Sequence, residues 1–466
     1  MIPMLDLDPH QIEAELALAE NRRFLLADEP GVGKTPPAIR AACRIGARSV
    51  LVLCPAIARE NWRRELEVWQ SPAQRWTVQV ADPKRVPDAD VVVASYNQLV
   101  AKTPFRTALF AREWDVLICD EAHFLKTPTS KRTRAVYGQH GTGPERGHGL
   151  AARSERVWLL TGTPTPNYVD ELWPHLRALW PDLISQFDRP MRYAEFVDAF
   201  CVTRSNDYGR KVISNKKAPV QELRNRLRPY AMRRLYQKVY PDTLPPRLVS
   251  TAVEADLSKV AAELDETSRA LCDEFLKVAK QGETAAVRWL QENLAAMSTV
   301  RRLNGVAKIK PTAEFIANAL DNGTQKIVLC AHHRDVVSGL VEQLRRYGSV
   351  EISGSTSPSA RQAAIDSFQN NKQTRVLVGQ ITAMSTAITL TAAHTIVFAE
   401  PSWVPAENRQ AIGRCHRRGQ TRRVQAHFLL VPESIDDRIV SALRAKTAGI
   451  RTLWDEQPTT QEKDHV

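Results

Sequence analysis

The stretch that decides the fold is Val116-Leu117-Ile118-Cys119-Asp120-Glu121-Ala122-His123. Its first four residues are apolar and predict a strand buried on both faces, as in a parallel sheet covered by helices. Two carboxylates follow where that strand ends, and open α/β sheets bind ligands at the carboxyl ends of their strands. The pattern therefore indicates either an acidic ligand site or a simple helix cap.

A second stretch, Phe24–Thr35, predicts a strand, a loop containing two glycines and the start of a helix. The strict pattern G-x-x-x-x-G-K-[ST] fails, because Asp28 occupies the first glycine position. Lys34 would reach the β- and γ-phosphates of a nucleotide, and the Thr35 hydroxyl would bind Mg²⁺. A surface Gly-Lys turn is the alternative. The acidic pair about 85 residues downstream favours the nucleotide site, where Asp120 would hold Mg²⁺ through water and Glu121 would orient and deprotonate the attacking water.

Two regions repeat the alternation of short apolar strands and amphipathic helices that is typical of a parallel sheet covered by helices, so the fold class is α/β with two lobes. In the first we expect a helix at Ala58–Trp69 and strands at Phe24–Ala27, Val50–Cys54, Val91–Ser95, Val116–Cys119 and Val157–Leu160. In the second we expect helices at Val336–Arg346 and Ser359–Gln369 and strands at Ile327–Ala331, Val350–Ile352, Val376–Val378 and Thr395–Ala399. Between them, from about Pro181 to Pro311, the sequence predicts mostly helix, especially Leu257–Asn293.

The length of 466 residues argues for two or three domains. No apolar run approaches the roughly 20 residues of a membrane helix, and Met1–Asp8 lacks the features of a secretory signal. We therefore expect an intracellular protein, cytoplasmic or nucleoid-associated, with no membrane partner. Seven cysteines without any Cys-x-x-Cys spacing indicate reduced thiols and argue against zinc and disulfides. Gly138–Gly149, with five glycines and two histidines, is expected to be a mobile loop rather than a metal site.

Positive charge predominates, with 64 Lys and Arg against 52 Asp and Glu and a formal net charge of +12. Ten of the basic residues but only one acidic residue, Glu222, lie in Arg210–Lys238, so this segment carries a net charge of +9. A concentrated positive charge favours a surface that binds a polyanion over an evenly solvated one. Phosphate contacts on such a surface supply affinity without reading sequence.

Several motifs resemble, in the same order along the chain, those of the SWI/SNF-type DNA translocases among the superfamily-two helicase-like ATPases. Asp120–His123 is similar to their motif II, and Asp is usual in that branch at the position of Asp28. Gln410–Gln420 is similar to their motif VI, whose two arginines reach ATP. The other matching segments are Pro9–Gln11, Asn61–Glu65, Ser95-Tyr96, Leu160–Asn167, Tyr230–Arg234 and Leu244–Arg247.

The resemblance, which spans about residues 7 to 440, implies two RecA-like lobes and a site for ATP and Mg²⁺. The implied catalytic residues are Lys34, Glu121, Arg414 and Arg417. ATP would be bound by Gln11, Asp28, Gly31, Gly33, Lys34, Thr35 and Gln410, and Mg²⁺ by Thr35 and Asp120. Implied DNA contacts are Asn61, Ser95, Tyr96, Thr163, Arg224, Arg226, Arg228, Arg233, Arg234, Ser355 and Thr382. Trp62, on the expected helix at Ala58–Trp69, is instead predicted to be a core residue.

Within the family, Ala331–His333, Gly354–Ser357 and Val397–Glu400 look most like the annealing-helicase (HepA-related) group. The resemblance implies an Mg-ATP-dependent motor that tracks along duplex DNA and remodels it, by fork remodelling or strand annealing. Its partner would be double-stranded or forked DNA. A strand-separating DNA or RNA helicase and a nucleotide-gated DNA-binding scaffold remain as alternatives.

The expected domains are RecA-like lobe one at residues 1–180, a helical insertion and basic linker at 181–310, RecA-like lobe two at 311–450 and a tail at 451–466. Because the match begins close to Met1, we expect a minimal motor without recruiting, chromatin-reading or histone-binding domains. A separate protein would then recruit this motor to its substrate. One departure from the family lies in motif V, at Ala383–Thr389, where Ala387 replaces a glycine. A positive φ at this position would strain an alanine.

Overall fold

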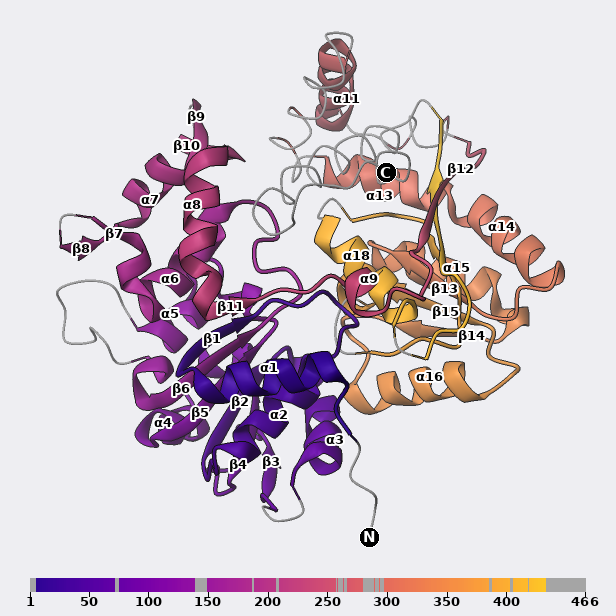
Figure 1. Ribbon diagram of the computed structural model, residues 1–466. Helices are drawn as coiled ribbons and strands as arrows, with labels where there is room; N and C mark the ends of the chain where they lie inside the picture. Colours follow the sequence, from indigo (N-terminus) through magenta and orange to yellow (C-terminus); the bar gives the residue numbers. More distant parts are fainter. Residues whose placement is uncertain are drawn as a thin grey trace. The chain divides into compact units, whose positions relative to one another are not determined.

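The computed structural model describes residues 6–432 except for positions 72–74, 139–148, 187, 207–208, 257, 259–262, 264–265, 280–288, 290–292, 294–296, 385–387, 403–404 and 418. The chain divides into two compact units between Tyr240 and Pro241. We call the described residues up to Tyr240 lobe one and those from Pro241 onwards lobe two (Figure 1). Most of the loop at Gly138–Gly149, the expected motif V alanine at position 387 and the tail at 451–466 lie outside the described residues.

Lobe one is built on a parallel sheet of seven strands in the order β11-β1-β6-β5-β2-β4-β3. The five strands expected in this region are confirmed to within a few residues. β3 and β11 were not expected: β3 has three half-buried residues, and β11 has two. The strands are β1 Arg23–Leu26, β2 Val50–Cys54, β3 Val78–Val80, β4 Val91–Ser95, β5 Trp114–Asp120, β6 Ser154–Leu160 and β11 Ala231–Met232.

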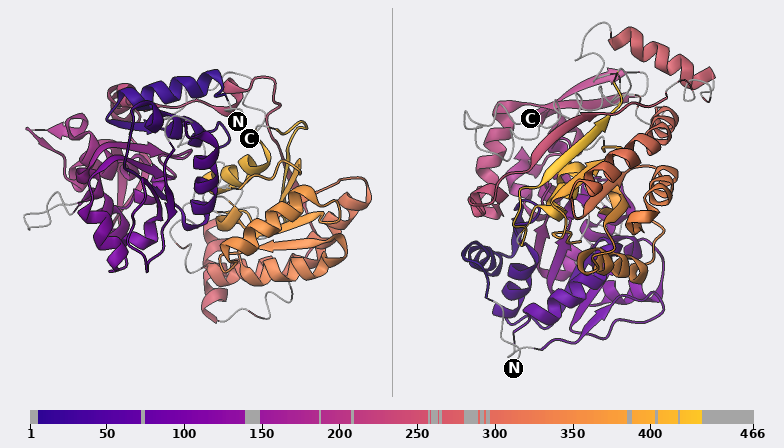
Figure 2. Two further views of the ribbon diagram at one scale, coloured as in Figure 1. Left: turned by 90° about the horizontal axis from the view of Figure 1, so that it is seen from below. Right: turned by 90° about the vertical axis from the view of Figure 1, so that its right-hand side faces the viewer.

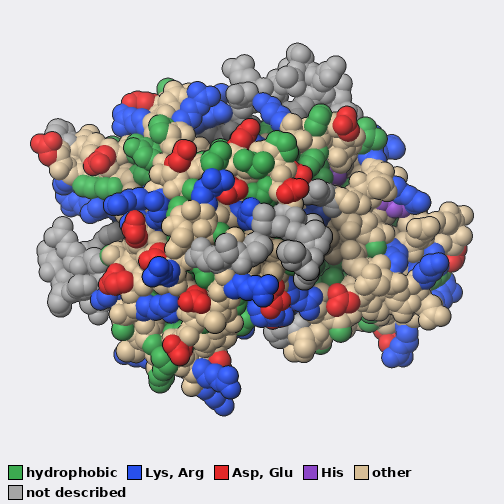
Figure 3. Space-filling view, turned by 60° about the horizontal axis from the view of Figure 1, so that its bottom comes forward, with side chains coloured by type: hydrophobic (Ala, Val, Ile, Leu, Met, Phe, Trp, Pro, Cys, Tyr) green, Lys and Arg blue, Asp and Glu red, His purple; other side chains and the backbone are tan. Residues whose placement is uncertain are grey.

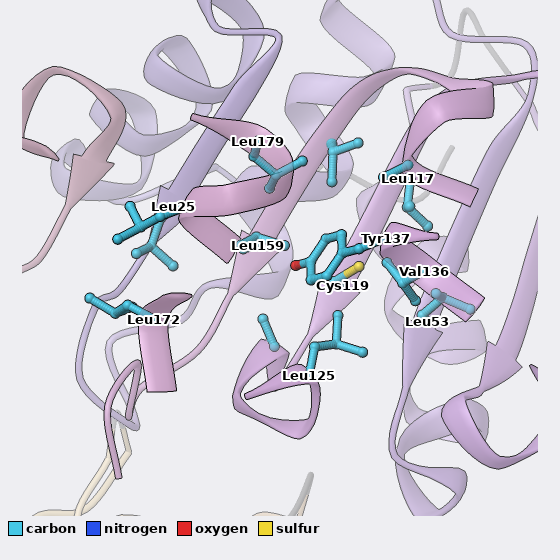
Figure 4. Packing of buried hydrophobic residues seen from close by; sticks show 14 of the residues in the cluster. Leu25, Leu53, Leu117, Cys119, Leu125, Val136, Tyr137, Leu159, Leu172 and Leu179 are labelled. Carbon is cyan, nitrogen blue, oxygen red and sulfur yellow. The ribbon is translucent and has the colours of Figure 1, made fainter. Parts of the chain in front are cut away.

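Helices cover both faces of this sheet, because alternate strand residues point in opposite directions. In Figure 1, α1 (Pro9–Glu20), α2 (Thr35–Arg44) and α3 (Arg59–Trp69) lie together on one face. The other face packs against α4 (Pro104–Ala111), α5 (Lys131–Tyr137) and α6 (Trp173–Leu179). Figure 4 shows Val136 and Tyr137 of α5 among the strand residues Leu117, Cys119 and Leu159, in a cluster that water does not reach. The continuous apolar strands are thus explained by burial on both sides.

The segment after α6 adds strands that were not expected to the region predicted to be mostly helical. It contains an antiparallel hairpin of β9 and β10, with a register irregularity between Val212 and Ser214, which stands out from the sheet in Figures 1 and 2. Charged residues such as Arg204 and Arg210 interrupt the apolar alternation that would have identified these strands. The elements are β7 Ser185–Gln186, β8 Arg189–Pro190, α7 Tyr193–Phe200, β9 Cys201–Asn206, β10 Gly209–Asn215, α8 Lys217–Leu227 and α9 Tyr236–Val239.

Lobe two holds a parallel sheet of six strands in the order β12-β17-β16-β13-β15-β14. Its four expected strands and two expected helices are confirmed, whereas β12 and β17 were missed. The strands are β12 Arg247–Ala252, β13 Ile327–Ala331, β14 Ser349–Ile352, β15 Val376–Gln380, β16 Thr395–Phe398 and β17 Gln425–Leu430. The helices are α11 Glu266–Ala279, α13 Ser298–Ala307, α14 Ile309–Asp321, α15 Arg334–Gln343, α16 Pro358–Asn370, α17 Ile381–Met384 and α18 Pro405–Cys415.

α11 confirms helix for part of the expected stretch Leu257–Asn293, and much of the remainder lies outside the described residues. Among the residues that the structure describes, no helix combines the length and the apolar character needed to cross a membrane.

Candidate nucleotide site and nucleic-acid surface

The loop between β1 and α2 has the backbone of a phosphate-binding loop. Gly31 and Gly33 have φ values of +92° and +91°, which glycine adopts without strain. A Cβ on Gly33 would be strained at this φ and would lie 2.5 Å from Nε2 of Gln11, so the Gln11 amide would have to move. Gln11 itself is 5% exposed, and its Nε2 donates to the Gly33 carbonyl at 3.1 Å. Helix α1 therefore fixes the shape of the loop.

Lys34 and Thr35 lie where this loop enters α2. Lys34 Nζ donates to the carbonyl oxygens of Asp28 and Glu29, at 2.7 and 3.2 Å. The ammonium group therefore lies against the backbone of the phosphate loop. Thr35 is the first residue of α2. Pro36 and Pro37 follow without disturbing the helix, because the first turn has no internal partner for their missing N–H groups. A positive charge and a helix N-terminus together attract phosphate.

Asp120 ends β5 and is held by three hydrogen bonds. Trp62 Nε1 donates to Oδ2 at 2.8 Å, the Glu121 backbone N–H donates to Oδ1 at 3.0 Å, and the Tyr96 hydroxyl donates to the Asp120 carbonyl at 2.8 Å. Burial, and then the neighbouring charge of Glu121, raise the pKa of Asp120 above its ordinary value, while Trp62 and Lys34 act in the opposite direction.

Glu121 has left-handed backbone angles of φ 51° and ψ 50°, which are uncommon outside glycine, asparagine and aspartate. Such a conformation costs on the order of 1 kcal/mol or more and is frequent at functional sites. The His123 ring lies beside the Glu121 carboxylate, with Nδ1 at 3.3 Å from Oε2. The same ring nitrogen lies 3.1 Å from the Thr161 hydroxyl and 3.3 Å from the Thr163 hydroxyl.

The 161–163 segment also approaches the phosphate loop. A Cβ on Gly162 would lie 2.7 Å from Cδ of Pro30, so only glycine allows this close approach. Three stretches of lobe one that are distant in sequence thus converge: the glycine loop, the acidic pair and the segment after β6. The glycine loop and the acidic pair were expected at one nucleotide site, whereas Thr163 of the third stretch was expected to contact DNA; in the structure the three stretches lie together.

The Asp28 carboxylate, at the start of the phosphate loop, is bound by Arg234. The Asp28 side chain is 2% exposed and forms an ion pair with Arg234, at 2.5 Å between Nη2 and Oδ2. The Arg234 backbone N–H donates to the same carboxylate at 2.8 Å. This contact secures the loop, and the expected role of Asp28 toward nucleotide stays a prediction.

Arg233 and Arg234 were expected to contact DNA, which stays a prediction; in the structure both side chains are engaged within lobe one. Arg233 Nη1 donates to the Ala27 carbonyl at 2.8 Å, and its Nη2 lies 3.7 Å from a Glu29 carboxylate oxygen. Their side chains are only 11% and 16% exposed. β11 pairs directly with β1, the strand that leads into the phosphate loop. The two guanidinium groups add side-chain contacts between the segment around β11 and this loop.

Ser95 and Tyr96 were also expected to contact DNA, yet they are 3% and 2% exposed and lie inside lobe one. The structure confirms that Trp62 is a core residue, 1% exposed. Thr163 is 9% exposed and lies against His123, while Asn61 is half-buried. Trp62 and Tyr96 both donate to Asp120, which lies 58 residues from Trp62 and 24 residues from Tyr96. No local motif could predict contacts over such separations.

Helix α8 carries the expected basic residues at the surface. Val220, Leu223 and Leu227 are its buried residues, so Arg226 points outward and Arg224 is half-buried. Arg228 directly follows the helix and is exposed. Arg226 pairs with Glu222 one turn earlier, an exposed contact that leaves the surface basic.

In lobe two, the expected ATP residues lie on and after α18. Gln410 and Arg414 are buried, at 4% and 6% exposed, and Arg417 donates to the Ile388 carbonyl at 3.0 Å and the Thr389 hydroxyl at 2.7 Å. Ser355 accepts a hydrogen bond from Arg334 after β14, and Thr382 is exposed on α17. Their roles toward nucleotide and DNA stay predictions.

Lobe one has a parallel sheet with a glycine loop and an acidic pair at its strand ends, and lobe two has a second parallel sheet. This combination defines the class of helicase-like proteins with two RecA-like lobes. The SNF2-related domain model matches residues 11–304, and the helicase conserved C-terminal domain model matches residues 307–419. The chain belongs to the SNF2-related family.

Two curated relatives show how far the similarity extends. The chain is 28% identical to the DNA annealing helicase and endonuclease ZRANB3 of Homo sapiens, over 95% of this chain and 41% of that protein. It is 28% identical to the SWI/SNF-related matrix-associated actin-dependent regulator of chromatin subfamily A-like protein 1 of Xenopus laevis, over 92% of this chain and 42% of that protein. The chain thus spans about two fifths of the length of these relatives.

Among solved structures, the chain is similar to the Sulfolobus solfataricus SWI2/SNF2 ATPase core in complex with dsDNA, with 22% identity, 98% of each chain covered and a TM-score of 0.44.

Proposed function

We propose that this chain is a DNA-dependent ATPase that tracks along duplex DNA. The observation that carries the proposal is the convergence of Lys34, Asp120 and Glu121 around the glycine loop of lobe one. The donor set suits Mg²⁺, which prefers carboxylate and hydroxyl oxygens, and Asp120 and Thr35 would hold it. Mg²⁺, when bound, would neutralise phosphate charge.

The residues around the loop would then divide the work of hydrolysis. The Lys34 ammonium would stabilise charge on the β- and γ-phosphates. Glu121 would accept a proton from a water molecule as its oxygen attacks the γ-phosphorus, which releases ADP and phosphate. His123, 3.3 Å from the Glu121 carboxylate, would orient that carboxylate from the side of Thr161 and Thr163.

Two substitutions test this assignment. Lys34→Ala should lower both nucleotide affinity and turnover, whereas Glu121→Gln should keep nucleotide binding and lower kcat by roughly 10²-fold or more, as expected for loss of a general base. Lys102→Ala, which removes an exposed lysine of the same lobe, is the control and should change neither. Turnover that survives Glu121→Gln would contradict the assignment and would favour a nucleotide-gated scaffold.

The basic surface of α8 supports the second half of the proposal, DNA binding through phosphates. On the face drawn in Figure 3, Lys and Arg side chains occur in several groups mixed with Asp and Glu. Along Arg210–Lys238 only Glu222 opposes ten basic residues. Two of the ten, Arg233 and Arg234, contact the phosphate loop. Of the other eight, Arg224, Arg226 and Arg228 lie together on and directly after α8 and are the central candidates.

Reversing Arg224, Arg226 and Arg228 to Glu should weaken binding of duplex DNA and reduce the slope of log affinity against log salt by about 3, since each phosphate contact contributes about 0.9. The matched control reverses Arg22, Arg48 and Arg85, which are exposed elsewhere on lobe one and impose the same change in net charge. Equal effects in the two triple variants would show that α8 has no special role.

The similarity to ZRANB3, a DNA annealing helicase and endonuclease, favours strand annealing as the use of this motor. A fluorescence assay with two complementary strands tests it: the wild-type chain with ATP should speed their pairing, and Glu121→Gln should not. Strand separation with ATP in the same assay would favour the strand-separating helicase instead.

A further inference from the structure

Trp62 and Tyr96 meet at Asp120 although they belong to different segments of lobe one. Trp62 lies in the first turns of α3, and Tyr96 begins the turn Tyr96–Leu99 directly after β4. The indole N–H reaches Oδ2 of Asp120 at 2.8 Å, and the phenol hydroxyl reaches its carbonyl oxygen at 2.8 Å. Both side chains are almost completely buried, at 1% and 2% exposed.

Each aromatic residue offers one polar group in an otherwise apolar side chain, and a buried group of this kind needs a partner. Asp120 is the partner in both cases. A carboxylate has about four lone-pair positions, and the hydrogen bonds from Trp62 and from the Glu121 backbone occupy one on each oxygen. Lone pairs remain for a metal ion or its water, while rotation of the carboxylate is prevented.

We propose that Trp62 and Tyr96 are positioning residues of the nucleotide site: their N–H and O–H groups set the orientation of Asp120 toward the metal-bound nucleotide. The indole sets the carboxylate, and the phenol sets the peptide that leads into Glu121. This inference rests on the proposed function, because it assigns Asp120 to Mg²⁺. Partners that orient a metal-binding residue typically change metal affinity or activity about 10- to 100-fold when they are removed.

The competing explanation is that the two rings only fill space in the core. Trp62→Phe and Tyr96→Phe separate the two explanations, because each keeps an aromatic ring and removes the hydrogen-bond donor. The chain offers a matched control for each. Trp69, on the same helix and 9% exposed, donates its indole N–H to Glu65 Oε2 at 2.9 Å. Tyr137, 8% exposed, shares a hydrogen bond of 2.7 Å with His175 Nδ1.

The experiment measures binding of a fluorescent ADP analogue to the full chain as a function of Mg²⁺ concentration, with a parallel series in EDTA. Trp62→Phe should raise the Mg²⁺ concentration for half-maximal binding about tenfold, and Tyr96→Phe should raise it to a smaller extent. Affinity in EDTA should stay at the wild-type value. Trp69→Phe and Tyr137→Phe should keep the wild-type Mg²⁺ dependence, although all four variants lose some thermal stability.

Several outcomes would overturn the inference. A wild-type Mg²⁺ dependence in both Trp62→Phe and Tyr96→Phe, or the same shift in their controls, would return the two rings to the role of core packing. If Trp62→Phe does not fold, Tyr96→Phe decides alone. If the unaltered chain binds the analogue independently of Mg²⁺, the proposed function fails and the inference fails with it, a result that differs from a variant-specific failure.

Discussion

The ion pair between Asp28 and Arg234 gives the sharpest prediction for the phosphate loop. The substitution Arg234→Gln removes the guanidinium group and leaves the Asp28 carboxylate in a site where it is 2% exposed. Three contacts to Asp28 are lost, from Nε at 3.1 and 3.2 Å and from Nη2 at 2.5 Å. The contacts of Nη1 to the His10 carbonyl and to a Glu13 carboxylate oxygen are lost as well. The backbone N–H of residue 234 still donates to Oδ1.

The expected cost follows from this geometry. Breaking a buried pair by removing one partner costs about 3–5 kcal/mol, because an uncompensated charge is left behind. The retained backbone donor and the 16% exposure of Arg234 place this case at the lower end, near 3 kcal/mol. That value is roughly a 150-fold change in the equilibrium constant for unfolding. Nucleotide affinity should fall as well, because Asp28 belongs to the phosphate loop.

Equilibrium denaturation followed by tryptophan fluorescence measures this loss in the free energy of unfolding. The transition to compare is the one that added nucleotide stabilises. Arg226→Gln is the control: its pair with Glu222 is exposed, and such pairs contribute under about 1 kcal/mol. A double-mutant cycle with Asp28→Asn should give a coupling free energy of about 2–3 kcal/mol. Equal losses for Arg234→Gln and Arg226→Gln would refute the reasoning. So would a loss of DNA affinity without a change in stability, which would restore Arg234 as a DNA contact.

Two further predictions concern single residues of lobe one. Gly33→Ala should weaken nucleotide binding, because an alanine is strained at a φ of +91° and its Cβ, 2.5 Å from Gln11 Nε2, would displace that amide. Gly46→Ala, with a φ of +69° and nothing within 4 Å of the added Cβ, should only lower stability. Equal nucleotide affinity in both variants would count against the loop geometry. Burial lowers the pKa of His175 to about 3, so the stability gained by keeping it neutral is complete above pH 6.5 and is lost as the pH falls toward 3, at about 1.4 kcal/mol per pH unit. Urea denaturation between pH 7 and 5 should show this slope in the wild type but not in His175→Gln, and identical slopes would contradict the assignment.

The strands that sequence could predict are those buried on both faces. Val50–Cys54, Val91–Ser95 and Ile327–Ala331 are continuous apolar runs, and their observed bounds equal the expected ones. β11 could not be predicted, because two residues become a strand only through their pairing with β1. β12 lies at a sheet edge with four of its six residues exposed, so it lacks the apolar run that identified the central strands.

The same distinction applies to the candidate site. The glycine loop and the acidic pair are local motifs, and strand ends on one edge of a parallel sheet bring them together. Arg234, the partner of Asp28, is 206 residues away, and no local sequence pattern predicts this pair. Tyr96 was assigned to DNA by resemblance. Strand register instead decides its surroundings: β2 pairs with both β4 and β5, which places the ends of those two strands close together.

Steady-state ATP turnover, measured with duplex, forked and single-stranded DNA and with RNA, tests the central claim most directly. The account predicts that duplex and forked DNA raise turnover well above the rate without nucleic acid, and that Glu121→Gln removes the increase. Stimulation by RNA alone, or no response to any nucleic acid by a chain that hydrolyses ATP, would contradict it.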